Sequence, residues 1–456
     1  MAIASTMVWE VRPTATAGNA NGGGYKPGAS GTDFSQQDAA QYNLTGVTTA
    51  AADAILLHAS AAADMVGNIA HITGGTNFTV GRYEIISIVA GVSITLDRNC
   101  TTAEGSAGVV NIGGALNFGT ADDAVFESMT AGNTMHIKAG TYTMTALSVA
   151  VAGSGVSPIT ISGYNTTRGD NPAFANQPVL AFGANTASFT HYYMISNLTI
   201  TTTAASGLAA GAGSLVQNCK STNSSGTANR DAFRTSASGS DGYRIIDCEA
   251  VSTNGYCFLN TGNNSEGVRV LRNYFHDSSV GYNSGSGNSV PIIENNIFDT
   301  VTYPIRLNSN DGHAYVNGNT LYGAETPTGT GIQLYATTPV GVVVTNNIIY
   351  GFDTGINSAA AVGTNYYNHN NIYNCTTPRV NVTAGPNDVS LAPQFTDAAN
   401  GNFSIGVNLK ALGSPGAFPA GLTTSYVDIG AVQRQEPTGG SSGGARIMIN
   451  GSVSGG

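Results

Sequence analysis

Acidic side chains gather in the middle of the sequence, at spacings that suit general acid–base chemistry. Asp247 and Glu249 stand two residues apart, and within a β-strand this spacing places both side chains on one face, about 6 to 7 Å apart. Glycoside hydrolases that invert configuration use two carboxyl groups at about that separation, one as the acid and one as the base. Asp277 and Asp299 follow one and two sequence repeats further along. We take these four residues as candidate catalytic groups.

The same carboxylates also fit a purely structural use. Isolated acids on the turns of a repeat structure are ordinarily solvated, or are paired with nearby arginines at little gain in stability. The arginines of this region are Arg244, Arg269, Arg272 and Arg306. Cleavage by β-elimination would instead need an Arg or Lys base with acidic calcium ligands. We favour a polar face or subunit contact, and expect any catalysis here to be that of a polysaccharide hydrolase or lyase.

Tyrosines are frequent in the same part of the chain. An exposed tyrosine ring can stack on a sugar ring or fill a seam between subunits, whereas a buried one only fills the interior. Strand alternation does not decide between these uses, because a one-residue error in register inverts the face. We favour the structural use and keep Tyr303, Tyr322, Tyr350 and Arg306 as candidate binding residues.

Metal and cofactor sites are not expected. The seven histidines are scattered without an HxH or HExxH pair, so the pattern of a dedicated zinc site is missing. The five cysteines contain no CxxC motif and are interpreted as small buried hydrophobic residues. The sequence predicts no metal and no cofactor.

The elements that must position these side chains are short and repeated. An asparagine or aspartate followed by apolar residues recurs every 21 to 29 residues, as in ENNIFDT at 294 to 300. The anchors are Asn197, Asn218, Asp247, Asn273, Asn296, Asn319, Asn347 and Asn371. Apolar runs this short suit strands, and each must stack on copies of itself to bury its apolar face. Because Asn tolerates turn conformations and can bond an equivalent Asn one coil away, the motif predicts a structural turn ladder.

The composition agrees with strands and turns. Charged residues make up 10% of the chain and Gly supplies 59 of its 456 residues, which disfavours long charged helices. The formal net charge of -10 leaves no basic surface for nucleic acid. We find neither a signal peptide at the start nor an apolar run long enough to cross a membrane, and expect no membrane insertion.

The repeat resembles the right-handed parallel β-helix proteins of the pectate-lyase-like superfamily. Besides the asparagine ladder, AGNTMHIKAGTYTM at 131 to 144 is similar to the first coil of that family, and VDIGAVQ near residue 430 is similar to its closing segment. The resemblance covers residues 116–433 and implies an all-β, single-stranded parallel β-helix. It implies no single function, since the fold hosts lyases, hydrolases, epimerases and inert viral spikes.

Three further segments flank the predicted helix. Residues 1–31 are Gly-rich and are expected to form an extended arm. Residues 32–115 are expected to form a small antiparallel β module with a hairpin in RYEIISIVAGVSITLDR, and this module resembles small β domains that precede β-helices in bacteriophage virion proteins. Residues 434–456 are predicted to be a Gly/Ser linker and a final strand, ARIMING, that caps the last coil or adds to a neighbouring subunit.

These features favour a bacteriophage virion structural protein: a fibre, tailspike or capsid-surface spike. Such a protein would be assembled in the host cytoplasm as a homotrimer, bind other virion proteins and contact host surface polysaccharide. The first alternative is a polysaccharide-degrading enzyme built on the same helix. The second alternative is a carbohydrate-binding adhesin without catalysis.

Overall fold

A computed structural model describes most of the chain. The described residues are 3–119, 122–228, 230–235, 241–261, 265–285, 289–307, 313–323, 327–335, 341–361, 363–414 and 427–433. The contacts divide the chain into two compact units, Met1–Thr201 and Thr202–Gly456, and each unit is described separately. The predicted tail strand in 434–456 lies outside the described residues.

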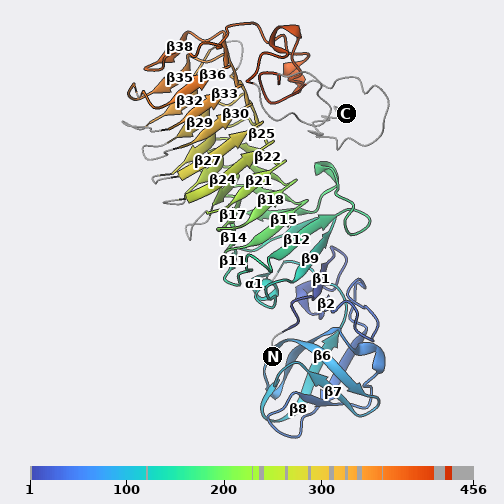
Figure 1. Cartoon of the computed structure of the whole chain (residues 1–456). Coiled ribbons are helices and arrows are strands. Elements are labelled where there is room, and N and C mark those ends of the chain that lie inside the picture. Colours follow the sequence, from blue (N-terminus) through green and yellow to red (C-terminus); the bar gives the residue numbers. More distant parts are fainter. Residues whose placement is uncertain are drawn as a thin grey trace, which may run out of the picture. The chain divides into compact units, whose positions relative to one another are not determined.

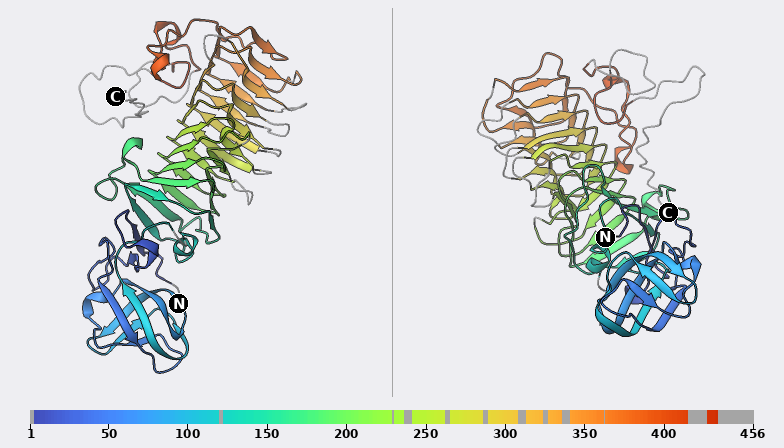
Figure 2. Two further views of the ribbon diagram at one scale, coloured as in Figure 1. Left: turned by 180° about the vertical axis from the view of Figure 1, so that it is seen from behind. Right: turned by 60° about the horizontal axis from the view of Figure 1, so that its bottom comes forward.

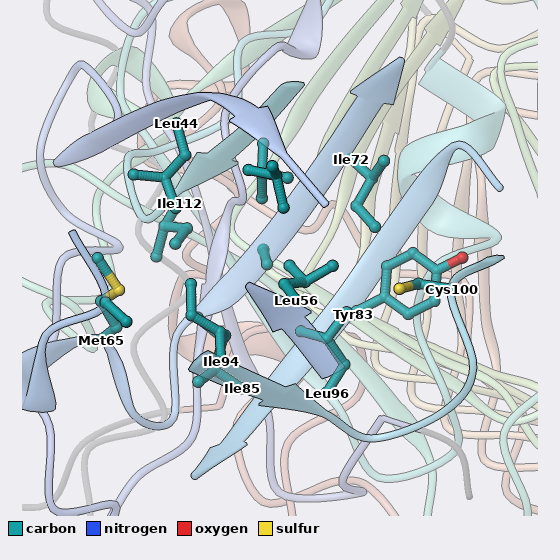
Figure 3. Packing of buried hydrophobic residues seen from close by; sticks show 14 residues of the cluster. Leu44, Leu56, Met65, Ile72, Tyr83, Ile85, Ile94, Leu96, Cys100 and Ile112 are labelled. Atoms are coloured by element: carbon teal, nitrogen blue, oxygen red, sulfur yellow. The ribbon is translucent and has the colours of Figure 1, made fainter. Parts of the chain in front are cut away.

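The first unit contains an antiparallel six-stranded sheet. Its strands, in spatial order, are β3 (Tyr42–Val47), β8 (Thr101–Ile112), β5 (Ile69–Phe78), β6 (Gly81–Val89), β7 (Ser93–Leu96) and β4 (Ile55–Leu57). The predicted hairpin is β6 with β7. A bridge between Thr48 and Leu57 brings the two edges of the sheet together, so it is nearly closed. The apolar side chains inside it, among them Leu56, Ile72 and Ile94, are fully buried (Figure 3).

The first unit also begins the parallel β-helix. One of its sheets contains β1 (Val8–Val11), β9 (Thr134–Lys138), β12 (Ile159–Tyr164) and β15 (Tyr193–Ser196), all parallel, with β2 (Gly24–Tyr25) antiparallel on β1. The other strands of this part are β10 (Thr141–Thr143), β11 (Leu147–Val149), β13 (Val179–Gly183), β14 (Ala187–Phe189) and β16 (Thr199–Thr202), and α1 (Asp122–Phe126) precedes them. The N-terminal arm therefore contributes strand β1 to the helix.

In the second unit each coil gives one strand to each of three parallel sheets (Figure 1). The first sheet contains β18 (Leu215–Gln217), β21 (Arg244–Ile246), β24 (Ser265–Leu271), β27 (Ser289–Glu294), β30 (Tyr315–Asn317), β33 (Val343–Thr345) and β36 (Tyr366–Asn368). The second contains β19 (Lys220–Asn223), β22 (Glu249–Ser252), β25 (Tyr274–His276), β28 (Ile297–Asp299), β31 (Thr320–Tyr322), β34 (Ile348–Tyr350) and β37 (Asn371–Tyr373).

The third sheet follows the second in every coil. It contains β17 (Leu208–Ala210), β20 (Phe233–Thr235), β23 (Tyr256–Asn260), β26 (Val280–Ser284), β29 (Tyr303–Leu307), β32 (Thr330–Leu334), β35 (Thr354–Ser358) and β38 (Thr377–Val380). The prediction of an all-β parallel β-helix preceded by a small antiparallel module is confirmed.

The core runs along the inside of the three sheets. Equivalent positions on successive coils stack apolar side chains, such as Phe275, Phe298 and Leu321 of the second sheet, each fully buried. Burying one such side chain contributes about 1.5 to 3 kcal/mol. Where the chain turns into the third sheet, the coils approach so closely that a Cβ on Gly281 would lie 2.5 Å from the Pro304 carbonyl oxygen. This crowding explains the small residue at that position.

The asparagine ladder is present along the turns that join the first sheet to the second. Each ladder residue donates from its side-chain amide to the side-chain oxygen of the next one, at 2.9 to 3.0 Å. The residues in order are Asn273, Asn296, Asn319, Asn347 and Asn370. Each of the first four also donates through its backbone N–H to the same oxygen. The predicted ladder is therefore found, fully buried.

The register of the predicted anchors is wrong by one residue at both ends of the series. Asn197, Asn218 and Asp247 have φ of 60°, 49° and 56° and occupy the left-handed turn position, one residue before the ladder. Leu198, Cys219 and Cys248 follow them at the ladder position itself. At the other end the ladder residue is Asn370 and not Asn371. Both adjacent positions accept Asn, one for its conformational tolerance and one for its amide, so sequence alone did not separate them.

The last described residues cover part of the second sheet. Phe395, Phe403, Ile405, Leu409 and Ile429 pack against the outer side chains of β28, β31 and β34. We call residues 389–433, as far as they are described, the C-terminal cover (red in Figures 1 and 2). The cover leaves β19, β22 and most of β25 outside these two apolar clusters. Glu249 and Asp277 lie on that uncovered part, whereas Asp299 is the last residue of β28.

Candidate functional site

Asp247 stands apart from the other predicted acids. Its left-handed φ of 56° places it in the turn between β21 and β22, so it does not share a strand face with Glu249 as expected. Its two carboxylate oxygens accept hydrogen bonds from Nε and Nη2 of Arg272 at 2.7 and 2.9 Å. This bidentate pair, on neighbouring coils, explains the residue as a local ion pair.

Glu249, His276 and Asp277 form a connected cluster on the outer face of the second sheet. Oε1 of Glu249 lies 2.6 Å from Nζ of Lys220 and 3.3 Å from Nε2 of His276. Nδ1 of His276 lies 2.8 Å from Oδ2 of the exposed Asp277. Burial alone would raise the pKa of Glu249, but the bonds from His276 and Lys220 outweigh it and lower the pKa. Burial would lower the pKa of His276, and its two carboxylate partners outweigh that and raise it.

Asp299 joins this cluster from the next coil. It is in register with His276, and its Oδ2 accepts a hydrogen bond from the Tyr274 hydroxyl at 2.7 Å. Burial raises the pKa of Asp299 more than this bond lowers it. Three of the four predicted acids are therefore brought together, and all three already have a partner: Glu249 with Lys220 and His276, Asp277 with His276, and Asp299 with Tyr274.

Two of the predicted binding tyrosines face the C-terminal cover. Tyr322 and Tyr350 stack with ring centroids 5.3 Å apart and an angle of 4° between the rings. Phe395 packs edge-on against both, and Phe403 packs against Tyr322. In this structure the pair fills the interface between the second sheet and the cover.

The other two predicted binding residues lie together on the third sheet. The guanidinium carbon of Arg306 lies 3.7 Å from the ring centroid of Tyr303 and 5.7 Å from that of Tyr335, an arrangement that favours the cation. Nε of Arg306 is buried and has no hydrogen-bond partner among the described residues. The same holds for Oε1 of Gln333, the residue in register with Arg306 on the next coil. Buried polar atoms without partners are rare in folded proteins, so two of them in register on neighbouring coils need an explanation.

Asp231, which the sequence did not single out, lies on the same sheet just before β20. It is completely buried, and Oδ2 accepts a hydrogen bond from Ser206 at 3.3 Å and lies 3.5 Å from Nη1 of Arg234. Oδ1 has no partner among the described residues. Burial raises the pKa of Asp231 to about 6. The only sequence signal was an acid directly before an apolar strand, which many turns share.

Tyr256 stands between Asp231 and Arg306 in the coil order of the third sheet. Its coil is the next after that of Asp231, whose neighbour Ala232 donates its backbone N–H to the Tyr256 carbonyl at 2.9 Å. Burial raises the pKa of Tyr256, the charge of Asp231 raises it further, and Arg306 lowers it. The tyrosine therefore lies within electrostatic reach of both groups.

We call this set the third-sheet face. Its members are Asp231, Arg234, Tyr256, Tyr303, Arg306, Gln333 and Tyr335. It combines aromatic rings, two cations and one carboxyl group with a raised pKa, which are the groups that bind sugar rings and transfer protons. No three His, Cys, Asp or Glu side chains converge as a metal site within the described residues.

Within the same described ranges, no helix is both long and apolar enough to span a membrane.

No protein-family model matches this sequence, and the search of curated proteins finds no match. Among solved structures, the pectate lyase Pel9A is similar at 13% identity and a TM-score of 0.41, over 69% of this chain and 91% of that one. A complex of XylC with xylose is similar at 10% identity and a TM-score of 0.40, over 69% and 61%. The catalytic domain of a GH87 α-1,3-glucanase is similar at 14% identity and a TM-score of 0.34, over 80% and 85%. With scores this low, the parallel β-helix is established by its own strand pairing.

Proposed function

We propose that this protein binds a polysaccharide along the third-sheet face and cleaves it there. The observation that carries the proposal is Arg306, which lies between Tyr303 and Tyr335 and keeps a buried Nε without a partner among the described residues. Arg306 is only partly buried, so a hydroxyl or carboxylate oxygen of a sugar would accept from the accessible part of its guanidinium, and the tyrosines would pack on the sugar rings.

The dimensions of the face suit a polymer. Asp231 and Gln333 lie on β-helix coils that are four steps apart, which corresponds to about 19 Å along the stack. Groups on successive coils can therefore bind successive sugar units. Because Arg234 and Arg306 are the charged donors of this face, and a guanidinium pairs with the carboxylate of an acidic sugar, we propose an acidic polysaccharide as the substrate.

Asp231 is the group we assign to proton transfer. With a pKa of about 6, about a tenth of this carboxyl group is protonated at pH 7 and about half at pH 6. It can donate that proton to the glycosidic oxygen once the side chain, completely buried in this structure, turns toward the bound sugar. Hydrolysis and β-elimination both require a proton on that leaving oxygen. The product distinguishes the two reactions, because elimination leaves an unsaturated sugar and hydrolysis does not.

The test is degradation of purified acidic and neutral polysaccharides, followed by chain length and by ultraviolet absorbance of unsaturated products. We expect Arg306→Ala to weaken binding at least about tenfold, and Asp231→Asn to lower the rate by about 10² or more with binding retained. The matched control is Arg269→Ala, which removes an exposed arginine of the first sheet and should leave binding and cleavage as in wild type. Cleavage that survives Asp231→Asn unchanged would remove the catalytic assignment.

The acidic cluster of the second sheet is the competing location for catalysis. If Glu249→Gln and Asp299→Asn abolish cleavage while Asp231→Asn does not, the chemistry belongs there. Binding that Arg306→Ala weakens, without any shortened product, would instead identify an adhesin.

The virion role expected from the sequence remains a proposal of its own. The feature that favours it is the nearly closed antiparallel module ahead of the β-helix, which suits an attachment domain. A homotrimer in solution, measured by light scattering, and retention of the protein in purified particles would support it. A monomer that is absent from particles would overturn it.

A further inference from the structure

A separate pocket lies at the last coil of the β-helix, away from the charged residues of the third-sheet face. Its volume is about 350 Å³, within the range of sites for small ligands. It is formed by β36 of the first sheet and by the segment around residues 381–386. Its principal lining residues are Asn365, Tyr366, Tyr367, Asn381, Thr383 and Pro386.

The two tyrosines of the pocket are held in place by amides. The side-chain amide of Asn368 donates to the Tyr366 hydroxyl at 2.8 Å, and that of Asn365 donates to the Tyr367 hydroxyl at 3.3 Å. Tyr366 is nevertheless 51% exposed. A ring that is fixed and still exposed presents a flat apolar surface at little further entropic cost, as sugar-binding tyrosines do.

The polar groups of the pocket are neutral. Asn381 has a left-handed φ of 54°, and its amide donates to the Ser358 carbonyl at 2.9 Å, which leaves its side-chain oxygen as an acceptor without a partner among the described residues. Thr383 adds an exposed hydroxyl. None of the residues that line the pocket carries a charge. A ligand with a charged group would have nothing here to pair with, whereas sugar hydroxyls match amides and hydroxyls.

We propose that this pocket binds one unit of a neutral saccharide, with a face of the sugar ring on Tyr366 and its hydroxyls on Asn381 and Thr383. The site shares no residue with the third-sheet face and differs from it in coil and in charge, so the inference does not rest on the proposed cleavage. It gives the protein a second carbohydrate site, selective for neutral sugars.

The test is isothermal titration calorimetry of the full-length protein. The neutral probes are cellotetraose, maltotetraose and xylotetraose, and the acidic probe is tetragalacturonate. We expect at least one neutral probe to bind and Tyr366→Ala to weaken it at least about tenfold. Tyr192→Ala, which removes a tyrosine of similar exposure in the first unit, should leave that binding unchanged. Arg306→Ala should also leave it unchanged, while weakening any acidic polysaccharide.

Two outcomes would overturn the inference. One is that no neutral probe binds at concentrations up to about 10 mM, a weak limit for a sugar site. The other is that a neutral probe binds Tyr366→Ala as tightly as wild type, which places its site elsewhere. Binding of the neutral probes reports on this pocket, and degradation of acidic polysaccharide reports on the third-sheet face. Failure of one proposal can therefore be told apart from failure of the other.

Discussion

The side-chain amide of Asn296 donates to the side-chain oxygen of Asn319 at 2.9 Å, and the amide of Asn319 donates in turn to Asn347 at 2.9 Å. Both donors of each rung, backbone and side chain, converge on one buried oxygen of the next coil. Replacing one ladder asparagine therefore leaves the two N–H donors of the preceding rung without an acceptor, and this loss accounts for most of the expected destabilisation.

We expect Asn319→Ala to lower the free energy of unfolding by about 3 kcal/mol, because it leaves two buried N–H donors of Asn296 without an acceptor. Urea unfolding followed by circular dichroism measures the change. The control is Asn254→Ala, whose amide donates only at an exposed turn, and its cost should be within about 0.5 kcal/mol. Equal costs for the two variants would show that the ladder does not stabilise the helix.

Asp388 closes the ladder, and we expect its removal to be costly. Oδ1 accepts from the backbone and side-chain nitrogens of Asn370 at 2.8 and 3.2 Å, and Oδ2 pairs with Arg379 at 2.8 Å. Asp388→Ala leaves the partly buried Arg379 without its carboxylate and the backbone N–H of Asn370 without its acceptor, at an expected cost of about 3 to 5 kcal/mol. Asp388→Asn keeps the oxygen for Asn370 and should recover part of that loss. If both variants unfold like wild type, Asp388 does not anchor the last coil.

Glu10 holds strand β1 to the first unit through several partners. It is completely buried, accepts from Nε and Nη2 of Arg168 at 2.8 and 2.6 Å, and also bonds to the Tyr164 hydroxyl. We expect Glu10→Gln to destabilise this unit by about 3 to 5 kcal/mol, because Arg168 then remains partly buried without its anion. Proteolysis of the N-terminal arm, followed by mass spectrometry, measures the loosening. Glu104→Gln, an exposed acid of the antiparallel module, is the control and should be digested like wild type.

Stability should depend on pH through His276 and Glu249. The raised pKa of His276 means that its contribution is present below its unfolded value of about 6.5 and is lost as pH rises through the folded value. The lowered pKa of Glu249 means that its contribution is present above about 4.3 and is lost as pH falls through the folded value. We therefore expect this pair to stabilise most between about pH 4.3 and 6.5.

His276→Gln tests that window. Unfolding free energies at pH 5.5 and 8.5 should differ less in the variant than in wild type, because the variant lacks the imidazole that gains a proton between Glu249 and Asp277. The same pH difference in both proteins would contradict the assignment.

The rate of cleavage should fall as pH rises above about 6. Burial raises the pKa of Asp231 to about 6, so its protonated and proton-donating fraction declines above that value. Replacing Arg234 with Gln removes a charge that lowers this pKa, and should move the alkaline limb of the profile to higher pH. Initial rates from pH 4 to 9 on a degradable polysaccharide measure the shift. An alkaline limb that stays in place in Arg234→Gln would exclude Asp231 as the group that titrates.

The sequence predicted the architecture well because the architecture is local and repeated. Short apolar runs that recur with an asparagine permit few arrangements, and the ladder from Asn273 to Asn347 lies at the predicted residues. The site was harder, because its chemistry depends on which side chains from separate coils share a face and which are covered. Asp231 looks like any turn acid until Ser206 and Arg234 are placed around it. Tyr322 and Tyr350 look like exposed sugar-binding rings in the sequence, because the sequence does not show that the C-terminal cover packs on them.

The spacing of the ladder also sets how this molecule can change in length. Asn296 and Asn319 are 23 residues apart and stand on consecutive coils, and each accepts two bonds from the preceding rung and donates two to the next. Deleting or duplicating one such block would leave every donor facing an equivalent acceptor, and would change the stack by about 4.8 Å. The length of the stack is thus adjustable in whole coils, and a longer or shorter β-helix can arise without any new kind of contact.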